Sequence, residues 1–196
     1  MAFIESISDE AASEEVTALF DVDRERLGYV ANYTRIFGHR PAVERARRQL
    51  LAAITENMDP RRYELATVAA ARRLRSSYCM LAHGKILAEE HLSPTVVGDL
   101  AVDPHAAELD EVDVAVMDFA GKVVDDATSV IPSDIARLRD LGLSDVEILD
   151  IALAAAVRCF VSKTIDALCV TPDTVFGELD ADLRRKLTVG RSLAAG

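Results

Sequence analysis

Apolar residues recur every three or four positions along most of the chain, which is the spacing of one face of a helix. One such stripe lies between Pro41 and Asn57 and consists of Val43, Ala46, Leu50 and Ile54. Strict alternation of apolar and polar positions, which indicates strands, is much less common. The pattern therefore predicts an all-α fold, a compact bundle of several helices.

Capping residues and prolines divide this pattern into separate helices. Ser13, followed by two glutamates, begins a first helix that ends near Leu27, before Gly28. Asp59 and Pro60 begin another, because a cap followed by proline is a helix start. The other expected helices cover residues 32–37, 41–57, 77–91, a short stretch after 93, 109–124, 133–142 and 144–168.

Cys79 and His83 are the pair of side chains with the greatest potential for chemical reactivity in this apolar sequence. Four residues apart on a helix, they share one face with Cβ atoms about 5–6 Å apart, so the imidazole can hydrogen-bond or deprotonate the thiol. Ser76 and Ser77 are a natural N-cap, which places Cys79 in the first turn of a new helix. The positive end of the helix dipole there favours a thiolate. Cys79 is therefore a candidate nucleophile.

Glu64 lies fifteen residues before Cys79, a separation of about 22 Å on one straight helix. If the chain breaks at residues 75–77 and the second helix folds back along the first, Glu64 comes close to His83. The predicted arrangement is a relay in which Glu64 orients or charges His83, and His83 activates Cys79.

The spacing of these residues resembles a known motif. Glu64, eleven residues, Ser76, two residues, Cys79, three residues and His83 is similar to the Glu-x11-Cys-x2-Cys-x3-His motif of the alkylhydroperoxidase D and carboxymuconolactone decarboxylase superfamily. Residues 27–51 resemble the lead-in of the same superfamily, and the chain from about 28 to 172 is similar to its peroxidase-related members. The resemblance implies their helical fold, with Cys79 as the peroxide-facing cysteine and His83 and Glu64 as its proton-relay residues.

Ser76 stands where the motif has its first cysteine. A serine cannot form the vicinal disulfide through which a two-cysteine member is recycled, so that redox cycle cannot run unchanged. An external thiol, or a cysteine elsewhere in the assembly, must restore Cys79. Tyr78, between the two motif positions, is a supporting residue that points either into a cleft or into a subunit contact.

A weak internal repeat appears when Asp59 is aligned with Ser144, because both are caps and a run of three alanines coincides. Cys79 then aligns with Thr164, so the second copy lacks the chemistry. We expect a duplicated helical unit with one active copy. The length suits a single domain, residues 1–196, with a polar C-terminal tail at residues 173–196.

The net charge of −11 disfavours binding to nucleic acid or to an anionic membrane and favours small molecules or proteins as partners. The charge is uneven: residues 24–75 hold twelve arginines against five acidic residues, a net +7, and the remainder carries −18. Solvated helix faces are one explanation. Contact between basic and acidic surfaces of subunits is the other, and the resemblance favours it, since superfamily members are commonly homo-oligomers.

Cysteine usage predicts a reducing compartment. Three cysteines are an odd number, and the N-terminal segment has no secretory pattern, so the expected location is the cytoplasm. No apolar run is long enough to span a bilayer. Only Cys79 and His83 have metal-ligand spacing, and no flavin, haem or nucleotide fingerprint is visible, so neither a metal nor a cofactor is expected.

Three functions fit these features. The favoured one is a thiol-dependent hydroperoxide reductase, an antioxidant enzyme in which Cys79 attacks a small-molecule hydroperoxide and an external thiol reduces it again. The second is a decarboxylase or isomerase of a small acid lactone, with His83 and Glu64 transferring protons. The third is a catalytically silent helical oligomer that acts as a binding protein.

Overall fold

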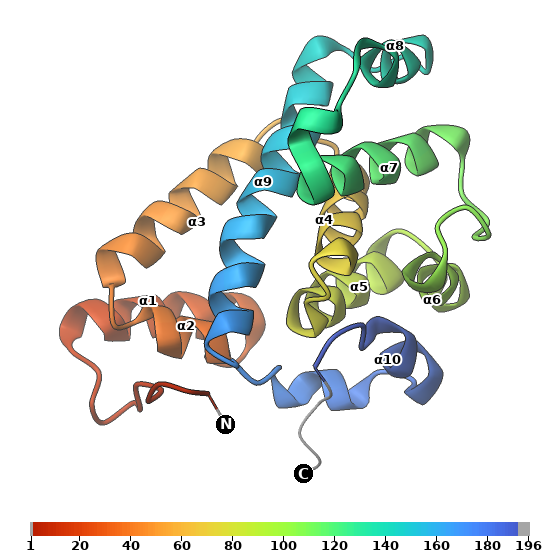
Figure 1. The fold of residues 1–196 in the computed structure, drawn as a ribbon. Coiled ribbons are helices and arrows are strands. Elements are labelled where there is room, and N and C mark those ends of the chain that lie inside the picture. The colour runs from red at the N-terminus through yellow and green to blue at the C-terminus, as the bar shows by residue number, and fades with distance from the viewer. Residues whose placement is uncertain (1, 192–196) are drawn as a thin grey trace.

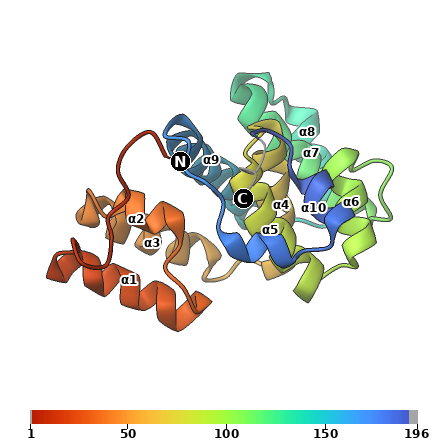
Figure 2. The ribbon, with the colours of Figure 1, turned by 90° about the horizontal axis from the view of Figure 1, so that it is seen from below.

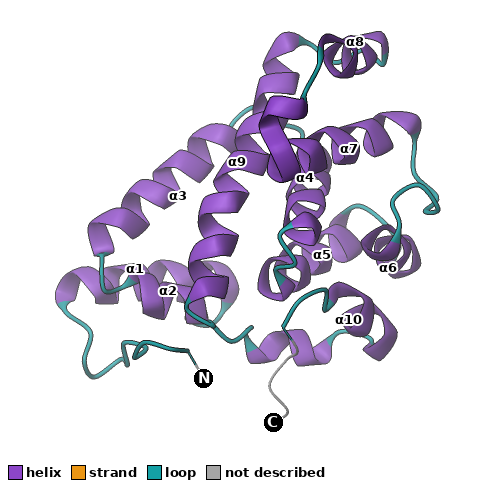
Figure 3. Ribbon diagram, viewed as in Figure 1, coloured by secondary structure: helices purple, strands orange, loops and turns teal. Residues whose placement is uncertain are grey.

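Every regular element in the computed structural model, which describes residues 2–191, is helical (Figure 1, Figure 3). The elements in chain order are α1 (Glu14–Leu27), α2 (Asn32–Phe37), α3 (Pro41–Thr55), α4 (Pro60–Arg73), α5 (Ser77–Glu90), α6 (Pro94–Val102), α7 (Glu111–Asp126), η1 (Ala127–Ser129), α8 (Pro132–Asp140), α9 (Asp145–Ala167), η2 (Thr174–Glu178) and α10 (Ala181–Leu187). The predicted all-α fold is confirmed. Within residues 2–191, no helix combines the length and the hydropathy that crossing a bilayer requires.

Helix α4 is the centre of the fold because it packs against α5, α7 and α9 at once (Figure 1). Its residues from Glu64 to Ala71 are all buried, and four of these eight are alanines, which let neighbouring helices approach closely. Seen from below, α1, α2 and α3 lie on one side of α9, and α4, α5 and α10 lie on the other (Figure 2). The site described below lies between these two groups.

The helix starts follow the predicted caps. The Ser13 hydroxyl accepts a hydrogen bond from a backbone N–H of the first turn of α1, and the Asp59 carboxylate does the same for α4. Ser144 and Glu147 form a reciprocal capping box at the start of α9. Gly28 ends α1 with φ at 81°, the left-handed conformation that glycine adopts without a steric penalty. These boundaries were predictable because each rests on contacts within one turn.

The predicted break between α4 and α5 is a Schellman motif. The N–H of Ser76 donates to the carbonyl of Ala71, and the N–H of Arg75 donates to that of Arg72, both at 3.0 Å. Arg75 takes the left-handed conformation, φ 55°, that glycine usually supplies at this position. The motif turns the chain so that α5 returns along α4.

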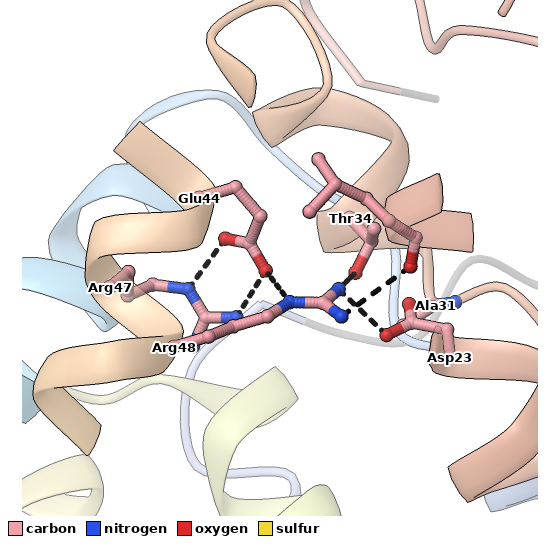
Figure 4. Close-up of polar contacts among 7 residues, drawn as sticks. Asp23, Ala31, Thr34, Glu44, Arg47 and Arg48 are labelled. Atoms are coloured by element: carbon pink, nitrogen blue, oxygen red, sulfur yellow. Dashed lines mark hydrogen bonds and ion pairs between the residues drawn. The ribbon is translucent and has the colours of Figure 1, made fainter. Parts of the chain in front are cut away.

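The buried face of α3 was predicted only in part: Ile54 is buried and Val43 packs against the core, but the middle of the predicted stripe is exposed. Leu50 is 51% exposed and Ala46 is exposed, whereas Glu44 and Arg47 are buried. The reason is an ionic network (Figure 4): two N–H groups of Arg47 donate to the Glu44 carboxylate at 2.5 and 2.6 Å, and Arg48 donates to Glu44 at 2.7 Å. Charged groups can leave water when they are fully paired in this way, and hydrophobicity alone does not reveal the pairing.

The segment after residue 173 is not a polar tail. Phe176, Leu183 and Leu187 are buried in the common core, and α10 packs against α5 and α6. Gly84 of α5 marks the contact, since a Cβ added there would lie 2.6 Å from a methyl group of Leu187. Residues 173–187 therefore belong to the core, while positions 192–196 of the predicted tail lie outside the described residues.

The internal repeat extends over one helix. Helix α9 continues without a break past Val161, the position that the repeat aligns with Ser76, and ends at Ala167. The second copy therefore does not reproduce the turn that separates α4 from α5. Duplication of a larger helical unit stays a prediction.

Candidate active site

A cavity of about 810 Å³ is lined by residues from the end of α1, from α2, α3, α4, α5 and α9, and from the segment after α9. The predicted site residues Glu64, Tyr78, Cys79 and His83 all contribute to its wall. All four tyrosines of the chain line it too, together with Phe176. The cavity is therefore large, aromatic and bordered by the residues that the motif singled out.

Glu64 and His83 form a hydrogen-bonded pair. Glu64 Oε2 lies 2.7 Å from Nδ1 of His83, so the predicted approach of these two residues across the α4–α5 break is confirmed. A carboxylate can only accept, so Nδ1 carries the hydrogen and Nε2 keeps its lone pair. Burial, followed by the positive charge of Arg158, lowers the pKa of His83. At neutral pH His83 is thus a neutral imidazole suited to accept a proton.

Cys79 is the third residue of α5 and is 2% exposed. Its sulfur is contacted by two residues of α9, with Ser162 Oγ at 3.1 Å and Arg158 Nη1 at 3.7 Å. Sequence reasoning missed both residues. The available signal was a polar pair one helical turn apart on the face of α9 that also carries buried apolar residues.

Arg158 is a buried cation at the end of the cavity where Cys79 lies. It is 4% exposed, and its Nη2 lies 3.3 Å from the hydroxyl of Tyr63, whose ring packs edge-on against His83. Burial by itself lowers the pKa of a guanidinium, but Cys79, Tyr63 and Glu64 outweigh that effect, and the pKa of Arg158 is raised. Arg158 therefore stays charged beside the thiol.

The thiol and the imidazole are not hydrogen-bonded to each other. Within residues 2–191, the hydrogen bond of His83 goes to Glu64, those of Cys79 come from α9, and none joins Cys79 to His83. The direct Cys79–His83 hydrogen bond that their spacing suggested is thus not formed. Both side chains line the same cavity, so a bound molecule or a water can transfer a proton between them.

Tyr78 points into the cavity wall. Its hydroxyl donates to the carboxylate of Asp173, which also accepts a hydrogen bond from the backbone N–H of Asn32 at 2.8 Å. Its ring packs edge-on against Tyr33 and Phe176. Burial and the nearby Asp173 raise the pKa of Tyr78 well above its usual value, so the phenol stays protonated. Tyr78 joins α5 to the C-terminal segment.

Ser76 occupies the N-cap position of α5, but its side chain makes no capping hydrogen bond, contrary to expectation. It is fully buried and does not line the cavity. The backbone carbonyl of Ser76 accepts the first helical hydrogen bond of α5, from Met80 at 3.0 Å. The turn is therefore defined by the backbone and does not need the hydroxyl.

Cys159 and Cys169 are not among the residues that line the cavity. Cys159 and Cys169 are partly exposed, and all three cysteines are unpaired. Within the part of the chain that the structure describes, no three histidine, cysteine or acidic side chains come together in a way that would hold a metal ion.

No protein-family model and no curated protein matches the chain, but solved structures do. An uncharacterized peroxidase-related protein from Ralstonia eutropha JMP134, described as an alkylhydroperoxidase AhpD core, is 24% identical with a TM-score of 0.83, over 89% of this chain and 94% of that chain. A peroxidase-related protein from Silicibacter sp. TM1040 is 19% identical with a TM-score of 0.83, over 90% and 94%. The debrominase Bmp8 is 16% identical with a TM-score of 0.72, over 93% and 94%.

The similarity in structure is high and extends over nearly the whole length of each chain. At these identities it defines the fold, and it agrees with the superfamily motif found at Glu64, Cys79 and His83. The chain therefore has the all-helical fold of the alkylhydroperoxidase D core, as the motif predicted.

Proposed function

We propose that the protein is a cysteine-dependent hydroperoxide reductase in which Cys79 is the nucleophile, His83 the proton carrier and Glu64 the residue that orients His83. The observation that carries this proposal is the Glu64–His83 hydrogen bond of 2.7 Å beside a cavity that Cys79 also lines. A nucleophile, a base and an orienting acid around one cavity form the usual arrangement for nucleophilic catalysis.

The proposed reaction has a balanced first step. The sulfur of Cys79 attacks the terminal oxygen of the hydroperoxide, an S–O bond forms and the O–O bond breaks. His83 carries the thiol proton to the leaving alkoxide, so the products are a sulfenic acid on Cys79 and an alcohol. The sulfur is oxidised by two electrons and the peroxide is reduced by two.

Recovery of Cys79 needs a thiol from outside the chain's motif, because Ser76 has no sulfur. One thiol condenses with the sulfenic acid, releases water and forms a mixed disulfide. A second thiol attacks that disulfide and restores the Cys79 thiol. A low-molecular-weight thiol or a thiol protein fits this role. We further propose a cytoplasmic location, where such thiols are abundant, and three unpaired cysteines support it.

A second candidate is the removal of halogen from a small aromatic ring. A cysteine-to-alanine variant of the debrominase Bmp8, which shares this fold with a TM-score of 0.73, was solved in complex with 2,3,4-tribromopyrrole. The aromatic lining and the volume of the present cavity suit a planar molecule of that size. Release of bromide from 2,3,4-tribromopyrrole in the presence of a thiol would favour this candidate over the first.

The deciding experiment is mass spectrometry of the full chain after one equivalent of cumene hydroperoxide, with a sulfenic-acid trap present. We expect trapped sulfenic acid on Cys79, formed faster than oxidation of Cys159 or Cys169. The Cys79→Ser variant should lose this fast reaction and consume hydroperoxide only at the slow rate of Cys159 and Cys169. If Cys79 reacts no faster than the other two cysteines, the reductase proposal is wrong. The dehalogenase, the lactone decarboxylase and the silent oligomer then remain as the alternatives.

A further inference from the structure

Arg158 is a buried cation without an acidic partner. Within residues 2–191, no carboxylate lies within 4.0 Å of its guanidinium, and its Nε has no hydrogen-bond partner. The other buried arginine, Arg47, differs because two of its N–H groups bind the Glu44 carboxylate. Removing a charge from water costs free energy, so a buried cation normally has an anion beside it.

Of the other arginines and lysines around the cavity, Arg26 is exposed to solvent, and the rest are paired with carboxylates. Arg47 and Arg48 pair with Glu44 and Asp23, and Lys85 pairs with Glu89. None of these carboxylates is available to Arg158.

The charged and titratable groups that are linked to Cys79 by a chain of contacts come from three helices. They are Tyr63 and Glu64 of α4, His83 of α5 and Arg158 of α9. Glu64 is held by His83, so the two groups that can supply a negative charge directly at Arg158 are the thiol and the phenol of Tyr63. A thiol ordinarily releases its proton at a lower pH than a phenol.

We propose that Arg158 is the counter-cation that holds Cys79 as a thiolate before any substrate binds, with the Ser162 hydroxyl as a second donor to the sulfur. Two donors from one face of α9 converge on the sulfur, at 3.1 and 3.7 Å. A thiolate accepts such hydrogen bonds far better than a neutral thiol does. The proposal builds on the role of Cys79 as the nucleophile in the proposed function.

A resting thiolate changes the role of His83. With no thiol proton to accept, His83 receives the proton of the hydroperoxide itself through Nε2 and passes it to the leaving alkoxide. The thiolate and the hydroperoxide then yield a sulfenate and an alcohol, and no further proton is consumed. The structure is compatible with this order of events, because His83 is hydrogen-bonded to Glu64 and not to the sulfur.

The test is the pH at which the Cys79 thiolate forms in the full-length protein without substrate. The ultraviolet absorbance of the thiolate is recorded between about pH 4 and pH 9, and the Cys79→Ser protein is subtracted to remove the other thiols and the tyrosines. We expect Arg158→Gln to move the midpoint upward by about 1–3 pH units, and Arg158→Lys to restore most of the shift. His83→Gln should move it much less than Arg158→Gln does.

Lys85→Gln is the matched control, since it removes another cation of the same cavity wall that already has a carboxylate partner. It should leave the midpoint unchanged. An Arg158→Gln midpoint equal to that of the wild type would overturn the proposal. If circular dichroism shows that Arg158→Gln does not fold, Ser162→Ala decides, with an expected upward shift of about one pH unit. An unchanged midpoint in that variant would equally overturn it.

The outcome is separable from that of the proposed function. A Cys79 that titrates as predicted but does not react with cumene hydroperoxide refutes the reductase and leaves the thiolate intact. A Cys79 that is oxidised rapidly and titrates identically in Arg158→Gln refutes only the role of Arg158.

Discussion

His83 Nδ1 lies 2.7 Å from Glu64 Oε2, although the two residues belong to different helices and are nineteen positions apart. The contact exists because the left-handed turn at Arg75 sends α5 back along α4. It fixes the tautomer of the imidazole and leaves Nε2 free to accept a proton. The chemistry of the site therefore depends on a backbone turn that contains no catalytic group.

Replacing Glu64 tests this relationship. Glu64→Gln offers an amide that can donate to Nδ1. Such a hydrogen bond stabilises the tautomer with its hydrogen on Nε2, and Nε2 then cannot accept a proton. We expect the rate of Cys79 oxidation by cumene hydroperoxide to fall on the order of 100-fold, with the fold retained. Stopped-flow measurement of hydroperoxide consumption checks this. Glu89→Gln, which removes an exposed carboxylate of α5, the helix that carries His83, is the control and should keep the wild-type rate.

The stability of the protein should fall with acidification through His83. The pKa of this residue is lowered by burial and then by Arg158, while the imidazole of the unfolded chain titrates at about 6.5. Below about pH 6.5 the unfolded state thus binds a proton that the native state does not. Stability is lost as the pH falls from there towards the lower native pKa.

Urea unfolding of the wild type and of His83→Gln at a series of pH values measures this effect. The difference between the two proteins cancels the contributions of other groups. We expect the wild type to lose stability more steeply than His83→Gln below about pH 6.5. Parallel curves would show that His83 is protonated equally in both states.

The parts of the fold that were predictable from sequence are local. Ser13, Asp59 and Ser144 begin helices through contacts within one turn, so their residue types and positions alone indicate the boundaries. The Glu64–His83 contact was also accessible, because one break in one helix determines it. Neither the helix boundaries nor this contact depends on segments that are distant in sequence.

Specific pairing of polar side chains accounts for the features that sequence reasoning missed. The buried face of α3 carries Glu44 and Arg47, which are tolerated there only because they bind each other. Arg158 and Ser162 reach Cys79 across about eighty positions of sequence, a contact that helical periodicity does not report. Both errors concern buried polar residues whose burial depends on a specific partner and not on their own hydrophobicity.

Self-association should depend on α9. Val146, Leu149, Leu153 and Phe160 lie on one face of this helix at helical spacing, and all four are among the exposed large apolar residues. An apolar stripe of this length on a surface helix is typical of an interface. We therefore propose that a second copy of the chain covers it, in a homo-oligomer.

Light scattering of Leu149→Glu/Leu153→Glu tests the interface. We expect the double variant to have the mass of one chain, 21.3 kDa, and the wild type a multiple of it. Val102→Glu alters another exposed apolar residue, on α6, and should keep the wild-type mass. A wild type that already scatters as one chain at micromolar concentration would refute the homo-oligomer.

The absence of a sulfur at position 76 should make oxidised Cys79 persist. The neighbouring thiol that would condense with a sulfenic acid is replaced by a serine hydroxyl, so the oxidised form waits for an external thiol. We expect a sulfenic-acid reagent to trap Cys79 in the native chain. In Ser76→Cys the trap should fail, and mass spectrometry should instead find a disulfide between positions 76 and 79.

The Ser76→Cys substitution suits this test because Ser76 is fully buried one turn from Cys79, and its hydroxyl does not cap α5. Loss of the hydroxyl should therefore leave the turn intact. The disulfide forms provided that the short bridge between positions 76 and 79 reaches an acceptable geometry. The matched control is Ser77→Cys, in which the added sulfur replaces a hydroxyl that accepts a hydrogen bond from Gly190 and stands one position outside the motif spacing. If Ser76→Cys retains a trappable sulfenic acid and forms no disulfide, recycling in this chain is not limited by the missing cysteine.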